Sequence, residues 1–455
     1  MASYEQNNSY SLKTLNLVKN IGKGTSAGVS ASNVSNVLSL IGAFEDLVIY
    51  HDINEIATSG YITIKEQGNL IKTFPIVGWE RLDVEFSLKA KSSDGNVSDI
   101  STPYKRSFFV YAVDEMAETS DTKKYTLHFA DLSALINVSS RLEHRYKGKA
   151  EDIIKEICGT DMFASHGIKN SPNGTSTAMP LVVNTSTKFQ MDYISPCWKP
   201  FDFINRIASL AVSSNGTFND CLFFQQTDGN FYFTDYLTLF SGQPVEFKKR
   251  PTVDTQVTDK YVINDFSNLS INSFVNYYYS GDVNATNTKY SLIPVTELNK
   301  VESEKAYIDT MISGYVKNNN GDPRFSAIKQ SPSACIATFS TGFDQSSIER
   351  CSTGTTQGVA YETARYAYAN GLPCHLNMRT KSVIFTLNPC TDLKLGQLVK
   401  INMGGTPSEK EEISMIDEFL NGTWYIGKIK YHLTLTEIEV DTECYSTSLN
   451  LQAKR

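Results

Sequence analysis

The sequence contains few of the residue patterns that build metal sites. Its eight cysteines include no Cys-x-x-Cys pair, and its six histidines include no His-x-His or His-x-x-x-His pair. These short spacings are typical of zinc ligands, so we expect no structural metal and no metal cofactor. Without such pairs, the cysteines are best interpreted as small buried side chains in a reducing compartment.

Motifs of nucleotide binding and of metal-dependent hydrolysis are missing as well. The sequence has no G-x-x-x-x-G-K-[ST] loop and no H-E-x-x-H helix. Cys374 and His375 are adjacent, and neighbours on a strand point to opposite faces, so they do not form a catalytic pair. We therefore expect that the protein is not an enzyme, and we name no catalytic or cofactor-binding residue.

Long apolar runs and long basic runs are also lacking. No stretch approaches the roughly 18 consecutive apolar residues of a membrane span, and the N-terminus holds no apolar signal core. The longest basic run covers residues 248–250, and the net charge is −7. This acidic balance argues against a protein that binds nucleic acid through its phosphates.

What the sequence does contain is an alternating strand pattern, most clearly over 44–86. Ile62 and Ile64 alternate with polar residues, and Leu82 and Val84 alternate with acidic residues. A period of two is typical of strands with one buried face. An aromatic content of 11% also suits β structure, so we expect an antiparallel barrel or sandwich here.

The same pattern recurs near the C-terminus. Leu82 is followed 27 positions later by Phe109, and Leu398 is followed 27 positions later by Tyr425, each in an alternating run. A further strand pattern follows in both regions. We interpret this recurrence as an internal duplication, which would set the architecture. The alternative is that two unrelated β-rich regions align this well by chance, because the two regions share few identities.

Between these regions the periodicity changes from two to 3.6. Ala150, Ile153 and Ile157 fall on one face of a short predicted helix, with Glu151 on the opposite, solvent-facing side. A second helical pattern begins further along the chain, near residue 200. The region beyond residue 142 is therefore predicted to be α+β.

The second predicted helix begins at Pro200, since proline is tolerated in the first turn of a helix. Phe203 and Ile207 form its apolar stripe, and we expect Gly216 to close it. A hairpin follows, because Asp-Gly at 228–229 separates two β-prone runs.

Together these patterns predict a mainly β protein with a smaller α+β part. A length of 455 residues allows about three domains. The predicted divisions are a flexible N-terminal arm (1–35), a first β domain (36–141), an α+β domain (142–236), a second β domain (237–280 and 371–444), an inserted region (281–370) and a C-terminal tail (445–455).

The order of these pieces resembles the central baseplate hub proteins of contractile-tailed bacteriophages, a family related to the hub part of secretion-system spike proteins. The resemblance spans roughly residues 40–445 and rests on diffuse motifs in a fixed order. The residues that carry it are 45–47 (EDL), 59–64 (SGYITI), 69–70 (NL), 75–80 (PIVGWE), the helix and hairpin over 201–233, 392–399 (DLKLGQLV) and 422–432 (GTWYIGKIKYH).

The resemblance implies both a fold and a function. Hub proteins of this kind carry two tube-like antiparallel β-barrel domains per chain and form homotrimers, so three chains present a pseudo-hexameric ring. Such a ring would join the sixfold tail tube, or its initiator protein, to the threefold central spike, with baseplate wedge proteins as further partners. The expected location is the tail baseplate of a virion assembled in the host cytoplasm. DNA would pass through the acidic ring without sequence-specific binding.

Interface residues are predicted from two loops that occupy the same place in the two β domains. Each loop lies between corresponding strands, where contacts between stacked rings would form. The alternative is that both loops are disordered tips. The predicted residues are Ser92, Ser93, Asp94, Gly95, Asn96, Met403, Gly404, Gly405 and Glu409. The alternative function is a carbohydrate-binding tail adhesin or another β-rich tail component, which would expose an aromatic platform and bind sugar as a free chain.

Overall fold

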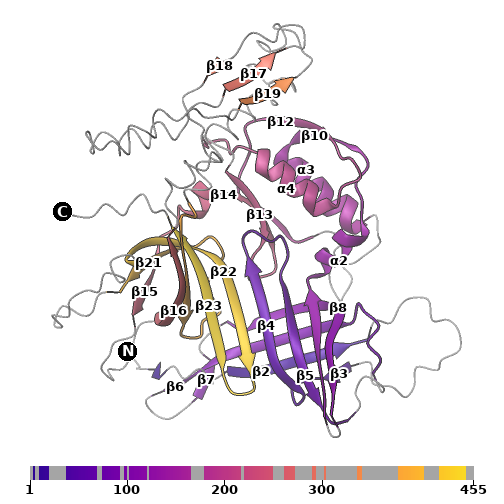
Figure 1. Cartoon of the computed structure of the whole chain (residues 1–455), viewed down its shortest axis with the longest axis vertical. Helices are drawn as coiled ribbons and strands as arrows, with labels where there is room; N and C mark the ends of the chain where they lie inside the picture. The colour runs from indigo at the N-terminus through magenta and orange to yellow at the C-terminus, as the bar shows by residue number, and fades with distance from the viewer. Residues whose placement is uncertain are drawn as a thin grey trace, which may run out of the picture.

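The computed structural model is dominated by antiparallel β-sheet (Figure 1). Among the residues that it describes, no helix is both long and apolar enough to cross a membrane. Two β units and a smaller α+β unit account for most of these residues. The described residues are 4–5, 10–19, 37–68, 74–92, 97–99, 102–119, 122–164, 179–216, 220–249, 261–271, 289–293, 302–303, 336–340, 378–403 and 420–446.

The first β unit is an antiparallel sheet built from the N-terminal part of the chain. The strands are β1 (Tyr4–Glu5), β2 (Tyr10–Val18), β3 (Val37–Ser39), β4 (Phe44–Asp52), β5 (Ser59–Glu66), β6 (Arg81–Ser92), β7 (Val97–Asp99), β8 (Tyr104–Glu118) and β9 (Lys123–Ala130). Their order across the sheet is β4–β5–β9–β8–β6–β2–β3, with β1 and β7 also paired to β6. The strands expected over 44–86 are therefore confirmed as β4, β5 and β6.

Strand β2 lies in the segment that the sequence assigns to a flexible arm. It runs antiparallel to β6, with Leu15 opposite Val84 and Leu17 opposite Leu82. Leu15 and Leu17 are fully buried. The arm assignment is therefore corrected for residues 10–18, because their apolar side chains alternate with period two and complete the first sheet.

The second β unit is a closed six-stranded barrel. The strands are β15 (Val245–Lys249), β16 (Val262–Ile271), β20 (Lys381–Leu387), β21 (Leu398–Asn402), β22 (Gly422–Thr434) and β23 (Ile438–Ser446). Their order is β16–β20–β23–β22–β21–β15, and a parallel pairing of β15 with β16 closes the ring. Because β15 pairs with both β21 and β16, each of the six strands has a neighbour on both sides over part of its length.

The two β units repeat one topology. The order β4–β5–β9–β8–β6 in the first corresponds to β16–β20–β23–β22–β21 in the second, with antiparallel pairing throughout both sets. A bulge interrupts β8 directly after Val110, and a bulge interrupts β22 directly after Ile426. Shared strand order and shared bulges support the duplication that the sequence pattern indicates.

The register of the repeat differs by one residue from the predicted alignment. Leu82 lies opposite Phe108 in the first unit, and Val399 lies opposite Trp424 in the second. All four side chains are buried. Leu82 therefore corresponds to Val399 rather than to Leu398. A one-residue shift exchanges the two faces of a strand, so burial decides between these alignments.

The two β units share a continuous sheet at their seam, where β4 and β22 lie side by side (Figure 1). Ile49 of β4 lies opposite Tyr431 of β22, and both side chains are fully buried. One hydrophobic core extends through both units, from Phe86 in the first to Phe385 in the second. The units are thus joined by backbone hydrogen bonds and a common core.

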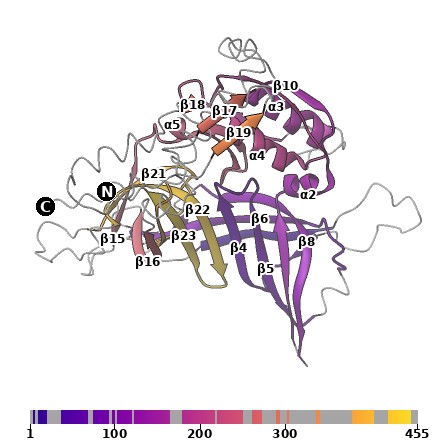
Figure 2. The same ribbon diagram turned by 45° about the horizontal axis from the view of Figure 1, so that its top comes forward.

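The α+β unit has its own hydrophobic core, and its main helices gather at one end of the two sheets (Figure 2). The predicted helices near 150 and 200 and the predicted hairpin are confirmed. The elements are α2 (Leu132–Ser139), β10 (Arg145–Lys149), α3 (Ala150–Glu156), the π-helix η1 (Ile157–Ala164), β11 (Leu181–Val183), β12 (Gln190–Ile194), α4 (Pro200–Leu210), β13 (Cys221–Gln225), β14 (Phe231–Asp235) and α5 (Tyr236–Leu239).

Two details of this unit differ from the sequence-based expectation. Glu151 is only 7% exposed, because its carboxylate accepts hydrogen bonds from the backbone N–H and the hydroxyl of Thr187. Helix α4 ends at Leu210, well before Gly216. Gly216 instead packs against Asp220, whose Oδ2 would lie 2.5 Å from a Cβ at position 216.

In the predicted insert, the described residues form a small sheet with the order β18–β17–β19. Its strands are β17 (Lys289–Ile293), β18 (Glu302–Ser303) and β19 (Ile336–Ser340). The sequence pattern also predicts a strand over 276–279, which reads NYYY, and a helix over 361–370, and both stretches lie outside the described residues.

Candidate functional site

The turn between β13 and β14 lies at the meeting point of all three units. On its second-unit side, the carboxamide of Gln226 pairs with the backbone of Leu395 in both directions. The Leu395 N–H donates to Oε1 at 2.7 Å, and Nε2 donates to the Leu395 carbonyl at 3.1 Å. The Thr227 hydroxyl donates to the carbonyl of Leu393 at 3.2 Å. The turn thus docks on the loop that precedes β21.

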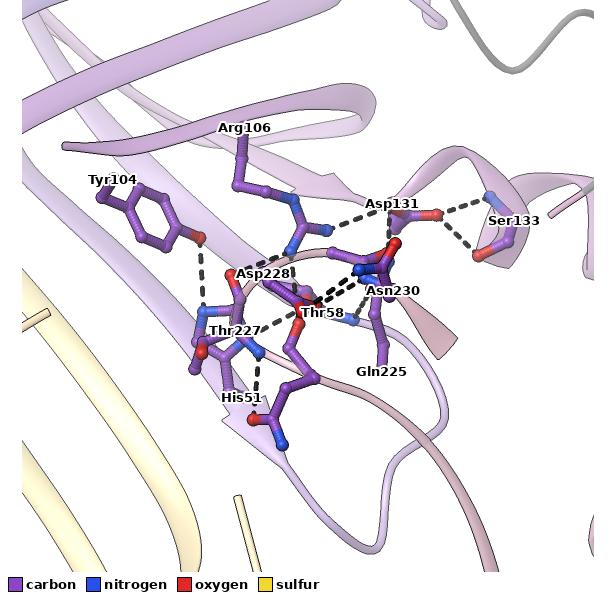
Figure 3. Close-up of polar contacts among 12 residues, drawn as sticks. His51, Thr58, Tyr104, Arg106, Asp131, Ser133, Gln225, Thr227, Asp228 and Asn230 are labelled. Atoms are coloured by element: carbon purple, nitrogen blue, oxygen red, sulfur yellow. Dashed lines mark hydrogen bonds and ion pairs between the residues drawn. The ribbon is translucent and has the colours of Figure 1, made fainter. Parts of the chain in front are cut away.

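Arg106 of β8 joins the same turn to the first β unit (Figure 3). Its Nη2 lies 3.2 Å from Asp131 Oδ2, and its Nη1 donates to the Thr227 carbonyl at 3.4 Å. Gln225 Nε2 donates to the same Asp131 oxygen at 2.9 Å. The Arg106 side chain is only 8% exposed, so its charge is balanced where water has little access.

Asp131 serves two elements at once. Its Oδ1 accepts hydrogen bonds from the backbone N–H and the hydroxyl of Ser133, at 3.0 and 2.6 Å. This is the N-cap of α2, where a side-chain oxygen satisfies one of the free N–H groups of the first turn. Its Oδ2 faces Arg106, so the start of α2 is tied to β8.

Gly229 completes the turn. Its φ of +93° lies in the left-handed region that favours glycine. A Cβ at this position would lie 3.0 Å from the Arg106 guanidinium carbon. The absence of a side chain therefore both permits the turn and lets Arg106 approach it.

His51 of β4 extends the polar network beneath the turn. Its Nδ1 lies 3.1 Å from the Thr58 hydroxyl, and its Nε2 lies 3.2 Å from the Tyr104 hydroxyl. The Thr58 N–H donates to Gln225 Oε1 at 2.9 Å, which links this network to β13. Burial, together with the nearby positive charge of Arg106, lowers the pKa of His51 well below its usual value. The imidazole is therefore neutral at pH 7.

The contacts of this site join three structural units. Within the part of the chain that the structure describes, no group of three His, Cys, Asp or Glu side chains converges to hold a metal ion. The stretch 24–28 reads GTSAG and matches the G-x-S-x-G pattern of hydrolases, which needs a strand before it and a helix after it. It lies outside the described residues. What the network itself can do is fix the α+β unit against both β units.

The predicted interface residues fall mostly outside the described residues. Ser92 is the last residue of β6. Met403 follows β21 and is 2% exposed, with its backbone N–H donating to Asn421 Oδ1 at 2.6 Å. Met403 therefore packs in the core of this chain. Ser93–Asn96, Gly404, Gly405 and Glu409 are not among the described residues, and their role stays a prediction.

Sequence reasoning missed the junction residues. The Asp-Gly turn signal locates the hairpin but does not show what the turn contacts. In the sequence, Gln226 and Arg106 cannot be told from ordinary surface polar residues, because their hydrogen-bond partners lie far away along the chain. The available signal was indirect, namely a glutamine pair next to a tight turn in an otherwise apolar hairpin.

The sequence matches no protein-family model and no curated protein at significant similarity. Its fold, however, is similar to that of solved tail proteins. A tail protein from Neisseria meningitidis MC58 is 10% identical, with a TM-score of 0.51 over 89% of this chain and 92% of that one. The 43 kDa tail protein of prophage MuSo2 from Shewanella oneidensis is 10% identical, with a TM-score of 0.46 over 90% and 94%.

A third structure is that of an E. coli component of the type VI secretion system, described as similar to the T4 tail proteins gp27 and gp5. It is 8% identical, with a TM-score of 0.43 over 89% of this chain and 74% of that one. Of these three, the Neisseria tail protein has the TM-score above 0.5, and the fold assignment rests on it. The chain therefore shares the fold of a solved tail protein, and the resemblance to tail proteins that the sequence suggests is confirmed at the level of the fold alone.

Proposed function

We propose that this protein is a structural component of a phage tail, and specifically the hub of a tail baseplate. In this proposal the chain forms a homotrimer whose six β units make a pseudo-hexameric ring. The ring joins the sixfold tail tube to the threefold central spike and leaves a channel for DNA ejection. The tube or tube-initiator protein, the spike and the baseplate wedge proteins are its proposed partners.

The observation that carries the proposal is the repeated β topology within one chain. Two units with the same strand order, joined through β4 and β22, offer two similar surfaces per chain. Three chains would then offer six, which is the number that a sixfold tube requires. The similarity of the fold to a tail protein supports the same conclusion.

The junction fits the mechanical task of such a hub. A hub that transmits force between tube and spike needs units that keep fixed relative positions. Here backbone hydrogen bonds join the β units, and the Gln226 carboxamide and the Arg106–Asp131 pair hold the α+β unit against them. No step of this function requires chemical catalysis.

The mass of the purified chain in solution tests the proposal. Light scattering should give about three times the chain mass of 50.7 kDa, either alone or with a candidate spike protein added. A stable monomer under both conditions would contradict the ring. An internal deletion of residues 93–96, between β6 and β7, should keep both strands and weaken contacts with the neighbouring ring.

A carbohydrate-binding tail component is the second candidate, favoured by one observation. Tyr50 and Tyr111 are 39% and 52% exposed on the outer sheet face. Tyr61 and His128 lie between them, with ring centroids 6.1–6.4 Å apart along the row. Glycan binding by the monomer that is lost in Tyr111→Ala would support this candidate. Absence of binding across a panel of bacterial surface polysaccharides would exclude it.

A further inference from the structure

The same kind of turn precedes one strand in each β unit. In the first unit this turn precedes β6. There the backbone N–H of Trp79 donates to the Val110 carbonyl at 2.8 Å, and the Val110 N–H donates to the Glu80 carbonyl at 2.9 Å. Val110 lies just before the bulge in β8. This pair of hydrogen bonds fixes where the turn meets the sheet.

The second copy precedes β21 and makes the same two bonds. The N–H of Gly396 donates to the Ile426 carbonyl at 2.7 Å, and the Ile426 N–H donates to the Gln397 carbonyl at 3.0 Å. Ile426 lies just before the matching bulge in β22. Trp79 therefore corresponds to Gly396, and Glu80 corresponds to Gln397.

The corresponding residues share an unusual backbone conformation. Gly396 has a φ of +76°, which glycine adopts readily. Trp79 has a φ of +66°, which is rare for a bulky side chain. Such conformations persist where the surrounding structure enforces them, and they cluster at functional positions. The first unit thus places a tryptophan where its duplicate needs only a glycine.

The first turn is held rigid from within. Glu80 is 1% exposed, and its two carboxylate oxygens accept the N–H groups of Val77 and Gly78 at 2.8 and 2.9 Å. In the second turn, the described residues give Gln397 Oε1 one such bond, from the Lys394 N–H at 3.1 Å. A pre-formed turn loses little conformational entropy when it binds a partner.

The two turns differ in what covers them. The second is covered by the α+β unit: the Gln226 carboxamide pairs with Leu395, and Leu239 of α5 lies 2.9 Å from where a Gly396 Cβ would be. The first turn projects Val77, which is 82% exposed, and Trp79, which is 38% exposed. The chain thus covers Leu395 and Gly396 of the second turn and leaves Trp79, the counterpart of Gly396, exposed, whereas Lys394, the counterpart of Val77, is exposed as Val77 is.

We propose that the turn formed by Val77, Gly78 and Trp79 is an anchor that docks against a second copy of this chain. This inference rests on the proposed function, since only an assembly of several chains supplies the second copy. A ring that makes the two β units quasi-equivalent has to cover the first turn with protein, as the chain itself covers the second. Tryptophan on a rigid turn is also typical of the few residues that dominate binding energy at interfaces.

Trp79→Gly is the variant that tests the anchor. Glycine is the residue of the duplicate turn and adopts a positive φ without strain, so the fold should be kept and its melting temperature unchanged or raised. The substitution should weaken the affinity between chains by at least about tenfold, as expected for an interface hot spot. Light scattering over a dilution series measures this affinity. Val77→Ser should weaken it in the same direction.

Leu435→Ser is the matched control, because Leu435 is 64% exposed in the turn between β22 and β23 and is not part of the anchor. This variant should associate as the wild type does. Hydroxyl-radical footprinting gives a second readout. Oxidation of Trp79 should fall as the wild-type concentration rises, while oxidation of Trp198, which is 42% exposed on the α+β unit, serves as the internal reference.

Two results would overturn the anchor, and they separate it from the proposed function. If the wild type assembles, Trp79→Gly assembles equally well and Trp79 stays reactive in the assembly, the anchor is wrong and the hub proposal stands. If the wild type stays monomeric at every concentration and Trp79 is protected only when another tail protein is added, both the second-copy anchor and self-assembly are wrong.

Discussion

Gly229 and Arg106 fit together because position 229 carries no side chain: a Cβ there would lie 3.0 Å from the guanidinium carbon. The relationship joins a turn of the α+β unit to a strand of the first β unit.

Gly229→Ala should destabilise the protein by about 1–3 kcal/mol, because alanine is strained at a φ of +93° and crowds Arg106. Urea unfolding measures the change. Gly242→Ala is the matched control, since Gly242 is exposed and nothing lies within 4 Å of its Cβ position. The control should change stability by less than about 0.5 kcal/mol. Equal effects of the two substitutions would contradict the close approach of Arg106.

Gln226→Leu should cost about 1–3 kcal/mol, because it leaves the buried backbone N–H and carbonyl of Leu395 without their partner. Hydrogen exchange should show the Leu395 amide losing protection, while amides within β13 keep theirs. Gln190→Leu, at an exposed position of β12, is the control and should leave that amide protected. An unchanged exchange rate at Leu395 in Gln226→Leu would show that the carboxamide does not hold the loop.

Asp131→Ala should be among the most destabilising single substitutions, at about 3–5 kcal/mol, because it leaves the Arg106 charge buried without its partner and removes the α2 cap. Adding Arg106→Met to Asp131→Ala should recover part of the loss, since no buried charge then remains. A double-mutant cycle on unfolding free energies separates the two contributions. Strict additivity of the two substitutions would argue against the ion pair.

Stability should fall as the pH falls below about 6.5, and His51 should account for part of the loss. Its pKa is lowered in the folded protein, so the unfolded chain takes up the proton first. Each pH unit between the unfolded and folded pKa values then removes about 1.4 kcal/mol per group. Unfolding of the wild type and of His51→Gln between pH 7 and pH 5 measures the difference. Parallel curves would contradict a neutral, buried His51.

Strand positions were the most predictable part of the fold. The period-two pattern places β5 and β6 correctly, and the spacing of Phe109 and Tyr425 anticipates the second β unit. The alignment fails by one residue at Leu82, because both Leu398 and Val399 are apolar and only burial distinguishes their faces. Strand β2 was missed because a single strand of nine residues gives a weak signal until its partner is known.

The junction could not be predicted in the same way. Asp131 caps α2 through a local contact, but its second role needs Arg106, which lies on β8, 25 residues earlier in the sequence. Helical periodicity places Glu151 on the solvent face, because the period does not reveal that the Thr187 hydroxyl donates to its carboxylate. Contacts of this kind arise from tertiary packing. Neither the hydrophobic periodicity of a segment nor its secondary-structure propensity reveals them.

The central claim is that three chains bring six similar β units into one ring, and electron microscopy of the purified assembly tests it most directly. Face-on class averages should show six similar lobes around a central channel at low resolution, reducing to threefold symmetry as detail improves. A ring with any other number of lobes, or particles the size of one 50.7 kDa chain alone and with spike protein added, would contradict the account.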